Sequence, residues 1–350
     1  MEVYVLNGLS GTKALIETYQ SCIWNVQYFG LGDFQFILPG TKQNIDLLQI
    51  DTLLVRSEDI TADGYENVMI IENRYIDYDV DKGWQLTIRG RGLKSILSRR
   101  IVWEQTNLTG NIEKCIRQVI SQNIINSGSR KISNFEMDEE IGLTDVIDVQ
   151  LLGENIAEWL SELCKSYGLG FDVYIKNGKY VFKLVKGADR TFDQDYNIPV
   201  VFSIEYDNLT HTTYTQDKGD YKNAALIGGE GEGIEKRTAS IGTATELERY
   251  EVYVDGSGVS SNGEIITEDT YYSMLRDYGE EQLAQTSQLS HVVGSVLPNG
   301  MYDLNVDYFL GDLVQIENTG ISAVTRIIEI IYAEDENGYS LVPTFSDWEG

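Results

Sequence analysis

The spacing of apolar residues changes its period twice along the chain, and this constrains the fold more than any other feature. Segments in residues 1–105, such as "GDFQFILPG" and "NVMIIENRYIDYDV", alternate apolar and polar residues or run apolar between Gly, Asp and Asn. That pattern is typical of β-strands. From Thr109 the apolar residues recur at helical spacing, and after Pro199 the strand pattern returns. The order is therefore β, α+β, β.

The middle region carries two amphipathic helices and a hairpin. One apolar face is formed by Ile112, Cys115, Ile116, Val119, Ile120 and Ile124. In "NIAEWLSELCKSYG", Asn155 is placed to cap a second helix and Gly168 to end it. Two alternating strands then flank Asn177-Gly178, a strong hairpin signal. We predict a small α+β domain over 106–197.

Strand patterns return in "VVFSIEYDNLTHTTYTQ" and in the last 50 residues, with a helical pattern within 268–287. A chain of 350 residues also exceeds what one hydrophobic core usually serves. We therefore predict an α+β, β-rich fold with two related β-barrel domains, an intervening small α+β domain and a helical insertion. The predicted ranges are 1–105 for the first barrel, 106–197 for the α+β domain, 198–250 and 290–350 for the second barrel, and 251–289 for the insertion.

The two β-rich regions resemble each other when Gly83 is placed on Gly338. The pairs that then coincide are Trp84 with Tyr339, Leu86 with Leu341, Ile76 with Ile331, Asp79 with Glu334 and Asp81 with Glu336. Strand order, turn position and an acidic hairpin tip are thus shared. We predict a duplicated barrel.

Charge and cysteine content exclude several classes of protein. Asp and Glu number 55 against 27 Lys and Arg, which gives a net charge of −28. Such a surface repels nucleic-acid phosphates and anionic membranes, so we predict no specific nucleic-acid binding and no membrane partner. The cysteines, Cys22, Cys115 and Cys164, form no close pair, and we predict no disulfide framework. The N-terminus lacks a signal-peptide pattern, so we expect synthesis in the cytoplasm.

Two segments imitate ligand-binding motifs and fail their tests. The glycine-rich stretch 228–233 has Ile234 where a dinucleotide loop needs its third glycine, and Glu230 and Glu232 stand where phosphate needs donors. In "DYDVDKG", Asp77, Asp79 and Asp81 match an EF-hand start, but the required glycine and glutamate positions do not match. We interpret the first as a flexible hairpin-type loop and the second as a solvated strand edge.

No catalytic set stands out. His211 and His291 lie in no recognisable triad spacing. The acidic cluster Glu136, Asp138, Glu139 and Glu140 is interpreted as a solvated loop. The basic stretch contains Arg89, Arg91, Lys94, Arg99 and Arg100, and we expect it to pair with an acidic neighbour in the chain or in another subunit. We predict no catalytic residue, no metal site and no cofactor; a carboxylate-based cell-wall glycosidase and a host-surface carbohydrate-binding or receptor-binding protein remain as alternatives.

Several segments, taken together, resemble siphophage tail-tip hub proteins, the family that also forms the N-terminal hub of tail-associated lysins. The segments are Gly187, Asp189, Arg190 and Thr191, then Phe202-Ser203, Asn208-Leu209 and the glycines of 228–233, with "RGRGLKSILSRRIVW" before them and "YFLGDLVQI" after. They occur in consistent order over most of the chain. None of them is a catalytic signature.

The resemblance implies a phage baseplate hub fold and a structural role rather than an enzymatic one. Three copies would form a ring whose six barrels adapt the hexameric tail tube to the tail tip and surround the DNA conduit. It implies a homotrimer with distal tail and tail tube proteins, and with tape measure or tail-tip fibre proteins, as partners. The location would be the tail tip of a phage or prophage virion.

Overall fold

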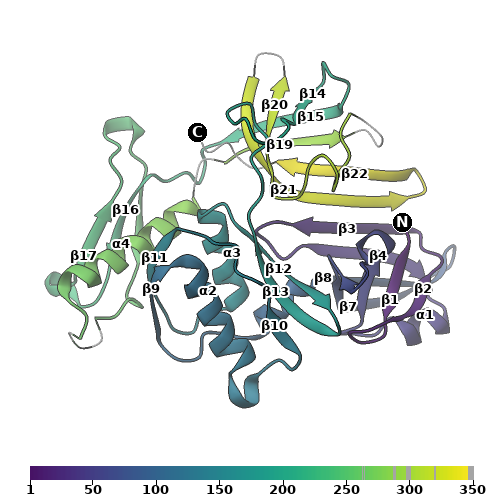
Figure 1. Ribbon diagram of the computed structural model, residues 1–350, viewed down its shortest axis with the longest axis horizontal. Coiled ribbons are helices and arrows are strands. Elements are labelled where there is room, and N and C mark those ends of the chain that lie inside the picture. The colour runs from purple at the N-terminus through teal and green to yellow at the C-terminus, as the bar shows by residue number, and fades with distance from the viewer. Residues whose placement is uncertain (262, 264, 287–288, 297–300, 319–320, 346–350) are drawn as a thin grey trace.

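The computed structural model describes residues 1–261, 263, 265–286, 289–296, 301–318 and 321–345, and only the backbone at 210–216, 289–296, 318 and 321. The fold is mixed α+β and rich in strands, as predicted. Figure 1 shows the first β-rich region on the right, the second above it, and helices α2 and α3 toward the left. The N-terminal strands therefore lie beside the last strands of the chain.

Most strands belong to one large sheet. Its strands from the first region are β1 (Val3–Leu6), β2 (Thr12–Ile16), β3 (Ser21–Gln27), β4 (Asp33–Pro39), β5 (Leu53–Arg56), β7 (Met69–Asp79) and β8 (Gly83–Gly92). Those from the last region are β14 (Val201–Ser203), β15 (Leu209–Asp217), β19 (Leu289–Val296), β20 (Leu313–Asn318), β21 (Ile321–Asp335) and β22 (Gly338–Phe345). Antiparallel pairing of β21 with β3 joins the two regions. The short helix α1 (Lys42–Leu47) follows β4.

The two regions repeat the same antiparallel strand order. The first runs β3-β4-β8-β7-β5 and the second runs β15-β19-β22-β21-β20. Each region contains a long hairpin, β7–β8 in the first and β21–β22 in the second. The first strand of each hairpin carries a β-bulge at an equivalent place, at Glu72 in β7 and at Ile328 in β21. The residue that precedes the bulge pairs with Gly90 in one hairpin and with Phe345 in the other. Bulges are specific local features of a strand, so a shared bulge strengthens the case for a duplication.

The structure corrects the predicted residue match by one position in the first strand of each hairpin. Leu86 pairs with Ile76, whereas Leu341 pairs with Tyr332 rather than with Ile331. The cause is the turn, because residues 80–82 separate the strand ends in one hairpin and only 336–337 do so in the other. Among the described residues, the strand pairings close neither region into a complete barrel, so the barrels stay a prediction.

The middle region packs two helices against short sheets. It contains β9 (Thr106–Asn111), α2 (Ile112–Ile120), β10 (Phe135–Met137), β11 (Val146–Leu151), α3 (Ile156–Ser166), β12 (Gly170–Lys176) and β13 (Lys179–Val185). The side chain of Asn155 caps α3 as predicted, accepting from the amides of Ala157 and Glu158. The hairpin turns at Asn177 and Gly178, whose φ angles are +50° and +72°. The short strand β6 (Gly64–Tyr65) of the first region pairs with β12.

A separate three-stranded sheet stands at the left of Figure 1. It consists of β16 (Ala224–Gly228), β17 (Thr238–Ile241) and β18 (Glu251–Asp255), and α4 (Glu268–Ala284) covers it. We predicted an insertion over 251–289, but β16 and β17 lie in this sheet and not in the large one. Their short strand patterns carry no sign of which sheet they join. The helix itself was predicted within 268–287, and its Tyr271, Met274 and Leu275 are buried.

Candidate functional site: the junction between the three regions

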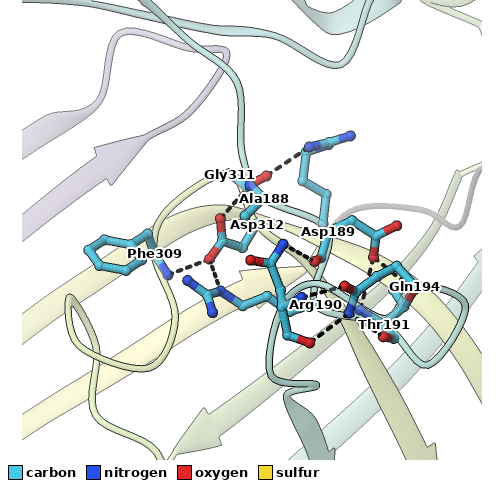
Figure 2. Close-up of polar contacts among 10 residues, drawn as sticks. Ala188, Asp189, Arg190, Thr191, Gln194, Phe309, Gly311 and Asp312 are labelled. Carbon is cyan, nitrogen blue, oxygen red and sulfur yellow. Dashed lines mark hydrogen bonds and ion pairs between the residues drawn. The ribbon is translucent and has the colours of Figure 1, made fainter.

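Two of the sequence segments that carry the family resemblance meet in space. Asp189 in the linker after β13 forms a parallel bridge with Leu313 at the start of β20. The amide of Leu313 donates to Ala188 O over 2.9 Å, and the amide of Arg190 donates to Leu313 O over 2.8 Å. Figure 2 shows these segments side by side. The linker is thus tied to the last region as a short added strand.

A buried carboxylate holds this contact. Asp312 accepts from the amide of Ala188 over 2.7 Å, from the amide of Phe309 over 3.0 Å, and from Arg190 Nε over 2.6 Å. Figure 2 shows the carboxylate between these three donors. The side chains of Arg190 and Asp312 are only 16% and 3% exposed. We call Ala188, Arg190, Phe309 and Asp312 the clasp.

Tyr28, just beyond β3, connects all three regions beneath the clasp. Its hydroxyl donates to Val185 O and accepts from the Gly187 amide, each over 2.9 Å. Burial raises the pKa of this hydroxyl, so it keeps the proton that it donates. A Cβ at Gly311 or at Gly170 would lie 2.2 or 2.3 Å from the Tyr28 ring, so both positions need glycine. Glycine permits the close approach of backbone to ring.

A cavity of about 490 Å³ with a mixed, mainly apolar lining lies beside Tyr28, where the first, middle and last regions meet. Lys94 is buried in its wall and donates to Gln27 O over 2.6 Å and to Phe171 O over 3.1 Å. Burial lowers the pKa of Lys94 to about 8. Lys183 and Glu66 form an ion pair of 2.6 Å in the same wall. The Lys94 hydrogen bond to Phe171 O and the Lys183–Glu66 ion pair each join the first region to the middle region.

The two segments that imitate ligand-binding motifs form hydrogen bonds within the chain instead. Glu230, inside the glycine-rich stretch, accepts from Ser260 and from the amide and hydroxyl of Ser261, and these bonds lower the pKa of its carboxyl against burial. Asp79 accepts from the amides of Asp81 and Lys82, which closes the hairpin turn. The carboxylates of Glu230 and Asp79 therefore both accept hydrogen bonds from within the chain.

The remaining candidates are scattered. Cys22, Cys115 and Cys164 are buried and free. His211 and His291 lie on the paired strands β15 and β19, but their side chains lie outside the described residues. In the predicted solvated acidic cluster, Glu136 pairs with Lys179 over 2.6 Å and Asp138 accepts from the Tyr174 hydroxyl over 2.7 Å, while Glu139 and Glu140 are exposed. The structure brings none of the described members of these groups together as a reaction centre.

The basic stretch pairs within the chain, in part as predicted. Arg91 binds Glu72 through two nitrogens, and Arg99 binds Asp51. Arg89 instead donates to Gln35 over 2.6 Å, and Arg100 to Arg130 O over 2.7 Å. The sequence indicated that these cations would have acidic partners, but it did not indicate that Arg89 and Arg100 would bind neutral groups instead.

Sequence reasoning missed Tyr28, Phe309 and Arg326. Arg326 donates to Gly311 O over 2.7 Å, and its guanidinium lies 5.8 Å from the centre of the Tyr28 ring. These residues sit in ordinary strand or loop sequence and become neighbours only in the folded chain. In the sequence, only Gly311, directly before Asp312, indicated that this segment makes a close contact.

The described residues contain no group of three or more His, Cys, Asp or Glu side chains placed to hold a metal ion. Within the same ranges, each helix is too short or too polar to span a bilayer.

Comparison with solved structures identifies the fold. The 43 kDa tail protein of prophage MuSo2 from Shewanella oneidensis superposes with a TM-score of 0.59 at 14% identity, covering 99% of this chain and 98% of that one. A tail protein from Neisseria meningitidis gives 0.57 at 14% identity, covering 99% and 96%. A prophage tail protein from Listeria monocytogenes gives 0.54 at 12% identity, covering 100% and 96%. At these identities the likeness concerns the fold.

No curated protein matches the chain by sequence. A family model does match, and it covers residues 2–346, which include the junction, the repeated hairpins and the separate sheet with α4. The chain therefore belongs to the family of Siphovirus ReqiPepy6 Gp37-like proteins.

Proposed function

We propose that this chain is a structural subunit of a phage or prophage tail tip, where three copies form a ring around the DNA conduit. Family membership over residues 2–346 is the observation that carries the proposal. The fold shared with prophage tail proteins along nearly the whole chain supports it. Nothing in this role requires catalysis.

The internal repeat supports the symmetry of the ring. Each chain holds two five-strand units with the same strand order. Three chains would therefore present six similar units, which is what a contact with a sixfold tail tube requires. We propose that the units are barrel-like in the assembled ring, with the ranges 1–105 and 198 onward as its two halves. Distal tail and tail tube proteins are the partners on one side, and tape measure or tail-tip fibre proteins on the other.

The charge of the chain suits a conduit. A net charge of −28 per chain makes three copies repel DNA phosphates at short range. Genome that passes through such a ring would bind nowhere along the wall. The junction has its role here, since it fixes the two units relative to each other and so sets the spacing of the six contacts.

Sedimentation and electron-microscopy class averages of the purified chain, alone and co-expressed with its tail neighbours, test this function. We expect a threefold ring in at least one of these preparations. A stable twofold dimer, with no trimer in any preparation, would overturn the adapter role. Turnover of cell-wall substrate that survives re-purification, and that one Asp or Glu substitution abolishes, would instead favour the glycosidase.

A further inference from the structure

The linker after β13 contains a loop that is held rigid by its own side chains. We call residues 189–198 the clamped loop. Gln194 Nε2 donates to Thr191 O and Asn197 O over 2.9 and 3.0 Å, and its Oε1 accepts from the amides of Tyr196 and Asn197 over 2.9 and 2.6 Å. Asn197 Nδ2 donates to Asp189 O over 2.8 Å. Figure 2 shows Gln194 and Thr191 at the centre of this network.

This rigid loop displays large apolar side chains to solvent. Phe192 is 57% exposed, and Tyr196 and Ile198 are each 79% exposed. Asp193 and Asp195 are exposed between them. Exposed apolar side chains on a pre-ordered backbone are typical of binding surfaces, because little conformational entropy is left to lose on association. Over the described ranges, no ion pair engages Asp193 or Asp195, so the clamped loop presents an acidic and aromatic surface.

A surface of the opposite sign lies where the end of the first region meets the middle region. We call Arg100, Trp103, Arg130 and Lys131 the Trp103 patch. The Arg130 guanidinium lies 4.8 Å from the centre of the exposed Trp103 ring, and Arg100 Nε donates to Arg130 O. A polar groove of about 610 Å³ runs beside Trp103 and Arg130. Among the described residues, no ion pair uses any of the three cations of this patch.

We propose that the clamped loop of one copy docks on the Trp103 patch of the next copy. Each chain carries a net charge of −28, so two copies repel unless opposite charges meet at their contact. Twofold pairing would use both surfaces of each copy at once and would stop at two copies. A head-to-tail contact leaves one surface of each copy free for the next copy, and it forms the ring where its rotation closes. The inference rests on the proposed ring and assigns its contact.

The experiment measures association by mass photometry and sedimentation in whichever preparation of the wild type forms the ring. The apolar variant changes Phe192, Tyr196 and Ile198 to Ser. Loss of a single interface hot spot weakens binding about 30-fold, so we expect at least that loss here. The matched control changes Ile234 and Leu247 to Ser, two fully exposed apolar residues of the separate sheet's loops, and should associate as the wild type does.

A charge swap makes the test specific. Asp193→Lys with Asp195→Lys, and separately Arg130→Glu with Lys131→Glu, should each weaken the ring, and one chain carrying all four changes should recover it. Circular dichroism checks that each variant is folded. This contact is refuted if the ring forms unchanged in the apolar variant, or if the variant with all four charge changes does not recover the ring. Either result leaves the proposed ring itself intact. Loss of binding to a tail neighbour with the ring intact would also overturn this contact. A wild type that never forms a ring overturns both proposals.

Discussion

Replacement of Asp312 by Ala should be among the most destabilising single changes in the chain. The substitution leaves the Arg190 guanidinium, which is 16% exposed, without its counter-ion. It also leaves the amides of Ala188 and Phe309 without their acceptor. Breaking a buried ion pair from one side costs about 3–5 kcal/mol, because the remaining charge stays buried and uncompensated. We expect a loss of that size in the free energy of unfolding.

The chain offers a matched control in Arg249 and Glu251. Their Nε to carboxylate distance is also 2.6 Å, but the Glu251 side chain is 69% exposed. Exposed pairs contribute about 0–1 kcal/mol, so Glu251→Ala should change the free energy of unfolding by no more than that. The two pairs thus differ mainly in burial and in the two backbone amides from which Asp312 also accepts hydrogen bonds.

Urea unfolding followed by circular dichroism measures both variants, and limited proteolysis reports on the linker. We expect a lower urea midpoint for Asp312→Ala and faster cleavage within 186–200, because the clasp holds that segment to β20. Equal unfolding free energies for the two variants would refute the reasoning, since burial would then have no effect. A large loss without faster linker cleavage would show that the clasp does not hold the linker.

Three further substitutions each test one local environment in the chain. Burial beside Glu162 and Asp277 raises the pKa of Glu281 to about 7, so the penalty for its charge is full above pH 7 and disappears as the pH falls toward 4.5. The protein should therefore become more stable on acidification by up to about 3 kcal/mol from this group. Glu281→Gln should reduce this dependence in urea titrations at pH 5.5 and 8, and the part that remains comes from Asp277 and Glu162, whose pKa values burial also raises. In Gly187→Ala the new Cβ would lie 1.8 Å from Gly311 O, so thermal unfolding should show a loss of about 1–3 kcal/mol that Gly258→Ala, in open space, does not. Gln194→Ala should accelerate proteolysis within 189–198 at unchanged circular dichroism; unchanged cleavage would mean that the side chain does not order the loop.

Periodicity determined most of the elements and their order, although the short helix α1 within the first region was not predicted. The helix over 155–168, its Asn155 cap and the Asn177-Gly178 turn follow from local preferences that neighbouring residues satisfy among themselves. The repeated hairpins could be found in the same way, but their match was one residue out in the first strand. A turn length changes register without changing the alternating pattern, so the pattern could not reveal the shift.

Tertiary structure decided which distant segments became neighbours. The strand β16 has the same kind of apolar pattern as the strands of the large sheet, yet it pairs with β17 and β18 under α4. Sheet membership depends on which surfaces bury together, and a short strand carries no record of that choice. The clasp depends in the same way on Asp312 reaching Arg190 across 122 positions of sequence. Local geometry, charge and family resemblance follow from the sequence alone, whereas the junction exists only because long-range packing buries a carboxylate beside its partners.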